Sequence, residues 1–398
     1  MSNTEFVFVT GMFRSGTTFV GKILDAHPGV TLVSDPYLSF FKYFRSLVAK
    51  DNGFEVSFDA PLSDYYWDRN PKSLLNYIQH GEFSRPFPAS LLDSLKGSIA
   101  KTAAPYSPKI LEHLEAANGS DFASLLESLL EVLRRSYGAS KPGSVIGFKC
   151  VWANEFIPPL TRCFPRSKVI QVQRDPRAVC ASKNVTPAKY PWIFLGRQWR
   201  KLAALNWLYQ NSNIPPGQVM TLYYEDMLRD PEGEAKRICE FLGVEYASEM
   251  IDPTMYTDGQ GNPWKQNTSY GNGAAHFDKC ASERWRAALL PEEIRTIERL
   301  CWPEMLLHGY QPISSIAQLA EFPLPPVLVP DSSLATWIKE FAPNDMRTAL
   351  LQMSEDSIRH AIAVAKEDVL GRIDKNVIES AFLSDVVAQK INSLVSQM

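Results

Sequence analysis

Hydrophobic positions at the start of the chain change from a continuous run to a helical spacing. Residues 6–9 are an apolar, strand-forming run, and residues 11–16 are a turn with a glycine at each end. Apolar residues then recur every three or four positions, which predicts a helix over 16–26. A buried strand, a glycine-containing loop and a helix N-terminus together are typical of a phosphate-binding site. The sequence therefore predicts such a site at residues 11–16.

The alternation of apolar runs and amphipathic stretches continues along the chain. We predict further strands at 30–33, 144–149, 168–173 and 218–224, and further helices at 153–163, 175–183, 192–211, 232–242 and 291–301. Asp175 and Pro176 supply an N-cap and a first-turn proline for the helix at 175–183. Gly243 ends the helix at 232–242. This order indicates an α/β fold with a P-loop-like doubly wound parallel sheet, in which ligands bind at the carboxyl ends of the strands.

Two stretches depart from this alternation. Residues 37–140 are mostly helical and rich in aromatic residues, and we predict a helical insert there that binds substrate. The alternative that its aromatic residues fill the core of a helical subdomain stays open. The predicted main domain spans 1–321 and is followed by a proline-rich linker at 322–332 and a helical C-terminal extension at 333–398.

One helical stripe in that extension contains Leu383, Val387, Ile391 and Leu394. It spans too few heptads for a long coiled coil. The stripe therefore predicts packing within the chain or a homo-oligomer contact through the C-terminal helices.

Composition narrows the classes of partner and compartment. The 398 residues are 45% hydrophobic and 21% charged, which is ordinary for a globular protein. A net charge of −3 favours neither nucleic acid nor an anionic membrane as partner. The six cysteines form no C-x-x-C pair, which favours reduced thiols. Without a signal-peptide pattern or a run of eighteen apolar residues, we expect a cytoplasmic protein without a membrane span.

The loop at 11–16 differs from that of a nucleotide triphosphatase. The spacing Gly11-x4-Gly16 matches a P-loop, but Thr17 stands where such an enzyme needs a lysine. The cation is instead Arg14, inside the loop. This difference argues against a P-loop kinase, although that function remains an alternative.

Three sequence motifs follow one another along the chain, each next to a predicted strand or helix. F-R-S-G-T-T at 13–18 opens the first helix, R-D-P-R-A-V-C-A-S at 174–182 follows a central strand, and Y-Y-E-D-M at 223–227 precedes a helix that ends in F-L-G at 241–243. Together they resemble the sulfotransferase family, which transfers a sulfuryl group from 3′-phosphoadenosine 5′-phosphosulfate (PAPS). The resemblance covers about residues 5–50 and 144–310. The R-S-G-T-T form is more similar to the carbohydrate, tyrosylprotein and bacterial members than to the cytosolic aryl type.

This resemblance implies roles for individual residues. The loop would hold the 5′-phosphosulfate of PAPS through Arg14, Ser15, Gly16, Thr17 and Thr18. Arg174 and Ser182 would hold the 3′-phosphate, because a guanidinium fork and a hydroxyl suit a phosphate. Ser269, in the segment 265–269, and the segment 284–286 would belong to a cover over the nucleotide. Arg14 and Lys149 would also be catalytic, by stabilising the sulfuryl and leaving-group oxygens without a metal.

The catalytic base is harder to assign. In the cytosolic type the third strand ends in Lys-x-His, whereas here Lys149 is kept and Val151 takes the place of the histidine. Asp35 matches the Glu-Pro position of the carbohydrate and tyrosylprotein branches, and we predict that it is the base. Asp35 as a simple turn residue, and His80 or His113 as the base, stay open.

We therefore expect a PAPS-dependent sulfotransferase that acts on a hydroxyl of a small-molecule, carbohydrate or peptide acceptor. A non-catalytic nucleotide-binding or scaffold protein on the same fold is the alternative from another class. Aromatic residues between 37 and 67 favour an apolar or sugar acceptor over a highly charged one. Trp152 has two interpretations, stacking on adenine or packing in the core.

Overall fold

The computed structural model describes residues 5–60, 62, 71–138, 145–182, 192–211, 214–215, 217–264, 277–322 and 346–398. The chain divides into two compact units. The first unit consists of residues 1–62, 76–173 and 213–279, and the second of 63–75, 174–212 and 280–398. Because each unit combines separate stretches, the predicted domain boundaries at 321 and 332 stay a prediction.

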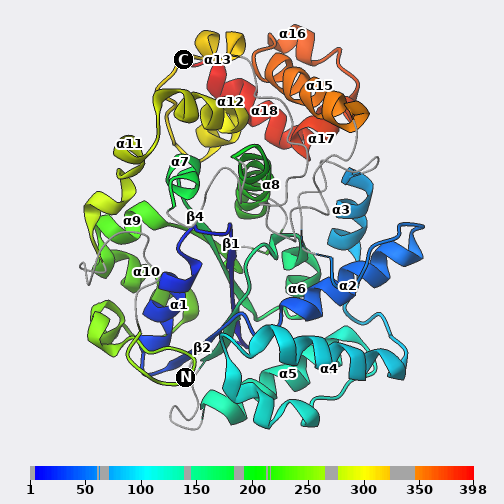
Figure 1. Ribbon diagram of the computed structural model, residues 1–398, viewed down its shortest axis with the longest axis vertical. Helices are drawn as coiled ribbons and strands as arrows, with labels where there is room; N and C mark the ends of the chain where they lie inside the picture. Colours follow the sequence, from blue (N-terminus) through cyan, green and yellow to red (C-terminus); the bar gives the residue numbers. More distant parts are fainter. Residues whose placement is uncertain are drawn as a thin grey trace. The chain divides into compact units, whose positions relative to one another are not determined.

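A parallel sheet forms the centre of the first unit (Figure 1). Its strands are β1 (Val7–Gly11), β2 (Val30–Ser34), β3 (Val145–Lys149), β4 (Lys168–Gln173) and β5 (Val219–Tyr223). Their order is β2-β3-β1-β4-β5 and every pair is parallel. β1 is buried along its whole length, as a continuous apolar run in a parallel sheet requires. The predicted α/β fold with a parallel sheet is confirmed.

The described residues of the two units contain seventeen α-helices. In chain order they are α1 (Thr17–Ala26), α2 (Leu38–Asp51), α3 (Pro71–His80), α4 (Ala89–Ala103), α5 (Phe122–Tyr137), α6 (Ile157–Cys163), α7 (Pro176–Cys180), α8 (Trp192–Asn211), α9 (Tyr224–Arg229), α10 (Pro231–Leu242), α11 (Trp285–Ala288), α12 (Pro291–Leu307), α13 (Ile316–Glu321), α15 (Met346–Ala363), α16 (Glu367–Leu370), α17 (Lys375–Phe382) and α18 (Asp385–Val395).

Helices cover both faces of the sheet in the first unit. On one face Gly21 of α1 lies against Leu32, and on the other Phe41 of α2 contacts Phe8 and Phe148. The described aromatic residues at the start of the insert, Tyr37, Phe40, Phe41 and Phe44, are fully buried. These residues fill the core, so the core interpretation is correct for them. The aromatic residues at 65–67 lie outside the described residues.

Two predicted helix ends are wrong. α12 continues past 301 to Leu307, through Pro303, because Trp302 and Met305 are buried and their packing outweighs the hydrogen bond that the proline cannot donate. α7 ends at Cys180 rather than at 183, so Ser182 lies beyond the helix.

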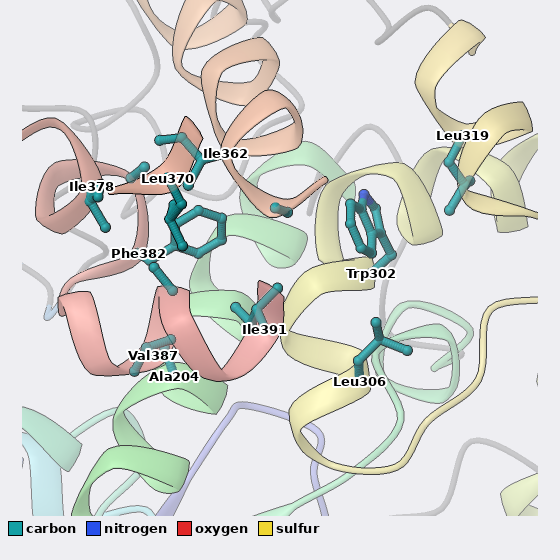
Figure 2. Close-up of a cluster of buried hydrophobic side chains, with 13 residues drawn as sticks. Ala204, Trp302, Leu306, Leu319, Ile362, Leu370, Ile378, Phe382, Val387 and Ile391 are labelled. Carbon is teal, nitrogen blue, oxygen red and sulfur yellow. The ribbon is translucent and has the colours of Figure 1, made fainter. Parts of the chain in front are cut away.

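The C-terminal helices pack on α8 and α12 within the second unit. Figure 2 shows the buried cluster that joins them, including Ala204 of α8, Trp302 of α12, Ile362 of α15, Phe382 of α17 and Ile391 of α18. The predicted stripe takes part in this cluster, because Val387 and Ile391 are buried and Leu383 and Leu394 pack against it. The stripe therefore packs within the chain, and an oligomer contact through these helices stays a prediction.

We expect His308 to make the second unit sensitive to acid. His308 is buried at the end of α12, with Nε2 2.8 Å from the carbonyl oxygen of Ala203, and burial lowers its pKa to about 4. An unfolded histidine titrates near 6.5, so as the pH falls the unfolded chain takes up a proton first. The free energy of unfolding should fall by roughly 3 kcal/mol between about pH 6.5 and pH 4. Urea denaturation across this range should show a flatter dependence in His308→Gln; an equally steep one would contradict this account.

Candidate active site

Three neighbouring strands of the first unit end close to residues with left-handed backbone. Arg14 follows β1 with φ 66°, Asp35 follows β2 with φ 49°, and Trp152 follows β3 with φ 61°. Such a conformation costs a non-glycine residue about 1–3 kcal/mol and is concentrated at functional sites. The carboxyl edge of β2, β3 and β1 is therefore the candidate active site.

The loop after β1 leaves the N-terminus of α1 open. Gly16 is the N-cap with φ 95°, no described side chain caps the helix, and its first turn contains no acidic residue. A Cβ atom at Gly16 would lie 2.4 Å from Cδ2 of Tyr224, so only glycine fits between the loop and that ring. Uncapped N–H groups at a helix N-terminus bind anions. The geometry suits the predicted phosphate site.

Ser15 shapes this loop from inside. Its backbone N–H and its hydroxyl both donate to the carbonyl oxygen of Met12, at 3.0 and 2.6 Å, and its side chain is fully buried. The hydroxyl proton is therefore used within the loop in this structure, and the part of Ser15 in phosphate binding stays a prediction. Thr17 is also buried, whereas Thr18 is half-buried.

Asp35 and Lys149 meet at the ends of β2 and β3. The Lys149 ammonium pairs with Oδ2 of Asp35 and lies 3.4 Å from Oγ1 of Thr18. The Asp35 backbone N–H donates to the carbonyl oxygen of Lys149 at 2.6 Å, which fixes the register of the pair. The other carboxylate oxygen, Oδ1, is buried and accepts no hydrogen bond from the described residues. A buried oxygen of this kind can accept a proton or hydrogen bond from a ligand.

An aromatic pair flanks the loop on the same edge. The rings of Phe13 and Trp152 are 5.7 Å apart, and the Trp152 N–H points to Sδ of Met12 at 3.3 Å. The Arg14 guanidinium carbon is 5.8 Å from the centroid of the Phe13 ring. Both aromatic side chains are half-buried, so Trp152 is not a fully buried core residue. They offer an apolar surface beside Arg14.

Arg174 and Ser182 belong to the second unit. The carbonyl oxygen of Arg174 accepts a hydrogen bond from Nε1 of Trp199 at 2.7 Å, and the Asp175 carboxylate caps α7. Ser182 is buried just past the end of α7, and its N–H donates to Val179 at 3.3 Å. The turn that carries the predicted 3′-phosphate residues is thus held by side chains of the same unit.

The predicted cover over the nucleotide is only partly described. Trp285 is buried between the guanidinium groups of Arg177 and Arg286, at 4.0 and 4.4 Å from its ring centroid. Trp285 is therefore packed inside the second unit, and a cover over the nucleotide by residues 284–286 stays a prediction. The segment 265–269, with Ser269, lies outside the described residues.

Family models match most of this chain. A model described as "Sulfotransferase family" matches residues 7–248, and one described as "Sulfotransferase domain" matches residues 196–309. The chain belongs to the sulfotransferase family. Its reaction is the transfer of a sulfuryl group to an acceptor.

The relatives of this sulfotransferase are named for two classes of acceptor, carbohydrate and protein tyrosine. Human carbohydrate sulfotransferase 6 is 23% identical over 84% of this chain and 88% of its own length. A Caenorhabditis briggsae protein named for protein-tyrosine sulfotransferase is 24% identical over 63% of this chain and 70% of its own length. Carbohydrate sulfotransferase 3 of Tetronarce californica is matched over only 41% of its length. The solved sulfotransferase domain from the curacin biosynthetic pathway is 15% identical, with a TM-score of 0.41, over 82% of this chain and all of that one.

The two alternative bases lie in the insert of the sulfotransferase. His80 is exposed at the end of α3, with Nδ1 2.9 Å from the carbonyl oxygen of Asn76, and His113 lies in a turn after residues 108–112. Over the described ranges, neither histidine forms a hydrogen bond with Asp35 or Lys149 that would resemble a catalytic pair. The geometry favours Asp35.

Sequence reasoning missed Lys22 of α1. Lys22 is one helical turn from Thr18 and so shares its face, and its side chain is 7% exposed. Burial lowers the pKa of its ammonium; Asp25 and Asp258 oppose this shift, and the charge of Lys149 adds to it. The spacing of four residues from Thr18 was the signal in the sequence that could have identified Lys22.

Across the described segments, no helix is long and apolar enough to cross a membrane.

Proposed function

We propose that this sulfotransferase moves a sulfuryl group from PAPS to a hydroxyl of a carbohydrate or tyrosyl acceptor, with Asp35 as the general base. The contact between Asp35 and Lys149 carries the proposal, because it places a carboxylate and a cation together at the end of adjacent strands. One carboxylate oxygen is held by Lys149, and the other is buried without a partner among the described residues. The second oxygen is the one that can take a proton.

Each group of predicted donor-binding residues suits one phosphate of PAPS. The uncapped N-terminus of α1, Arg14 and Thr18 suit a single phosphate that carries a sulfuryl group. Arg174 and Ser182 suit the 3′-phosphate that distinguishes PAPS from common nucleotides. No triphosphate chain has to be held, which agrees with Thr17 in place of a P-loop lysine.

Asp35, Lys149 and Arg14 would divide the work of an in-line displacement. Asp35 Oδ1 takes the proton of the acceptor hydroxyl while the hydroxyl oxygen forms a bond to sulfur. The bond between sulfur and the phosphate oxygen of the donor breaks, and the electron pair stays on the phosphate. Lys149 and Arg14 neutralise the charge that develops there, as cations do in phosphoryl transfer. The products are a sulfate ester and 3′-phosphoadenosine 5′-phosphate (PAP).

The acceptor assignment is supported by the Phe13–Trp152 pair. Half-buried aromatic rings stack well on a sugar face or on a tyrosyl ring, and this pair lies beside Arg14. The names of the relatives agree with these two acceptor classes. A cytoplasmic location and a metal-free reaction stay predictions.

Transfer of radiolabel from PAPS tests the proposed function. Oligosaccharides, tyrosyl peptides and simple phenols would be incubated with the full chain, and label in each acceptor would be counted. We expect label in a carbohydrate or tyrosyl acceptor, and transfer about a thousandfold slower with Asp35→Asn. A protein that binds PAP but labels no acceptor would support the non-catalytic alternative and contradict the proposal.

A further inference from the structure

Buried charges surround the turn that carries Arg174. The Arg177 guanidinium donates to Asp175 Oδ2 at 2.7 Å and to Glu298 Oε1 at 2.8 Å, and it lies over the Trp285 ring. Arg177 and Glu298 are at most 4% exposed. Glu298 belongs to α12 and also accepts from the backbone N–H of Ile313 at 2.8 Å. This network anchors α7 to α12.

Helix α8 holds the same turn from its backbone side. Trp199 donates to the carbonyl oxygen of Arg174 at 2.7 Å and is 1% exposed. The residues two before and one after it, Arg197 and Arg200, are equally buried, and both pair with Asp356 of α15, at 2.6 and 2.5 Å. Burial alone would raise the pKa of Asp356, but the two guanidinium groups outweigh it and hold the pKa at about 2. The stretch of α8 that donates a hydrogen bond to Arg174 is therefore held to α15 by ion pairs.

Helix α12 is fixed to α15 as well. Glu304, six residues beyond Glu298, is fully buried, and Arg359 of α15 holds both of its oxygens at 2.6 and 2.8 Å. Arg359 also donates to the carbonyl oxygen of Ala381 in α17 and lies 4.5 Å from the Phe382 ring centroid. Ala381 and Phe382 belong to the apolar cluster of Figure 2, so Arg359 lies against that cluster.

The two helices that hold the Arg174 turn, α8 and α12, thus both form ion pairs with one short stretch of α15. Asp356 and Arg359 are three residues apart and so share a face of that helix. Well-packed apolar residues are often as stabilising as buried ion pairs, so stability alone does not require charges here. What charged pairs add is fixed geometry, because each guanidinium fork must align with a carboxylate.

We infer that Asp356 and Arg359 are positioning residues for the 3′-phosphate clamp. Through α8 and α12 they set the position of Arg174, and with it the affinity for the 3′-phosphate of the donor. The inference rests on the proposed role of Arg174 in holding that phosphate. The C-terminal helices are then a working part of the donor site rather than an appendage.

Comparison of PAP with AMP isolates the 3′-phosphate. Calorimetric titration of the full chain gives the dissociation constant of each nucleotide, and their ratio measures what the 3′-phosphate adds. We expect Asp356→Asn to lower the ratio Kd(AMP)/Kd(PAP) about tenfold, while Kd for AMP changes less than about twofold. The substitution removes a negative charge, which by itself would favour the phosphate, so its electrostatic effect has the opposite sign. An unchanged ratio would overturn the inference, and so would a parallel rise of both constants.

Matched variants separate positioning from folding. Asp385→Asn, at the start of α18, makes the same chemical change at an ion pair with the exposed Lys375 of α17, and should leave the ratio as it is. Asp356→Glu keeps the charge and should restore most of the ratio. If Asp356→Asn does not fold, Arg197→Gln removes one of the two partners and should lower the ratio about threefold; an unchanged ratio there rejects the inference. A wild-type protein that binds AMP and PAP equally would instead refute the proposed clamp.

Discussion

Replacement of Asp35 by asparagine should lower kcat about a thousandfold and leave the affinity for PAP within about twofold of wild type. The amide has nearly the shape of the carboxylate but cannot take the proton of the acceptor hydroxyl. Its effect should therefore appear in the chemical step and not in donor binding. Initial rates with an identified acceptor, together with PAP titrations, measure both quantities.

Asp93→Asn is the matched control for this change. Asp93 is an exposed residue of α4 in the same unit, so its substitution should change neither rate nor affinity. Activity above a tenth of wild type in Asp35→Asn would exclude Asp35 as the base. In that case Asp35 would be the turn residue that its left-handed backbone before Pro36 also permits.

Lys149→Ala should lower kcat by about a hundredfold to a thousandfold, because a preorganised charge that stabilises the transition state is lost. PAP affinity should fall much less. The double variant with Asp35→Asn should be only slightly slower than Asp35→Asn alone, since contacting residues that act as a unit are not additive. Multiplicative losses in kinetic assays would show that the two residues act independently. Lys50→Ala, at the exposed end of α2, serves as the control.

Much of the fold follows from local pattern. The strands and α8 were predicted nearly to the residue, because continuous apolar runs and a long amphipathic helix leave little ambiguity. The end of α12 was not, because Pro303 is a helix-ending signal that only tertiary packing of Trp302 and Met305 overrides. The aromatic insert had two interpretations, and burial assigns Tyr37, Phe40, Phe41 and Phe44 to the core.

The candidate site was likewise predicted only in part from the sequence. Arg14, Lys149 and Asp35 could be named from motifs, yet the contact of Asp35 with Lys149 joins residues 114 positions apart. Only the sheet order, with β2 beside β3, brings them together. The use of the Ser15 hydroxyl inside the loop depends on backbone geometry that composition does not reveal.

Buried ion pairs are hidden from sequence reasoning for a related reason. Glu298, Asp356 and Arg359 have no motif around them, and a charged residue on a helix is usually assigned to the surface. Their partners come from distant helices, so only the folded second unit identifies them.

Nucleotide preference tests the central claim most directly, because it needs no knowledge of the acceptor. Thermal unfolding of the full chain would be followed with PAP, AMP, or ATP and Mg²⁺ at equal concentrations. A ligand at a hundred times its Kd stabilises the native state by about 2.7 kcal/mol. We expect PAP to raise the Tm clearly more than AMP does, and ATP to have little effect. Stabilisation by ATP and Mg²⁺, with none by PAP, would contradict the account and point to a kinase.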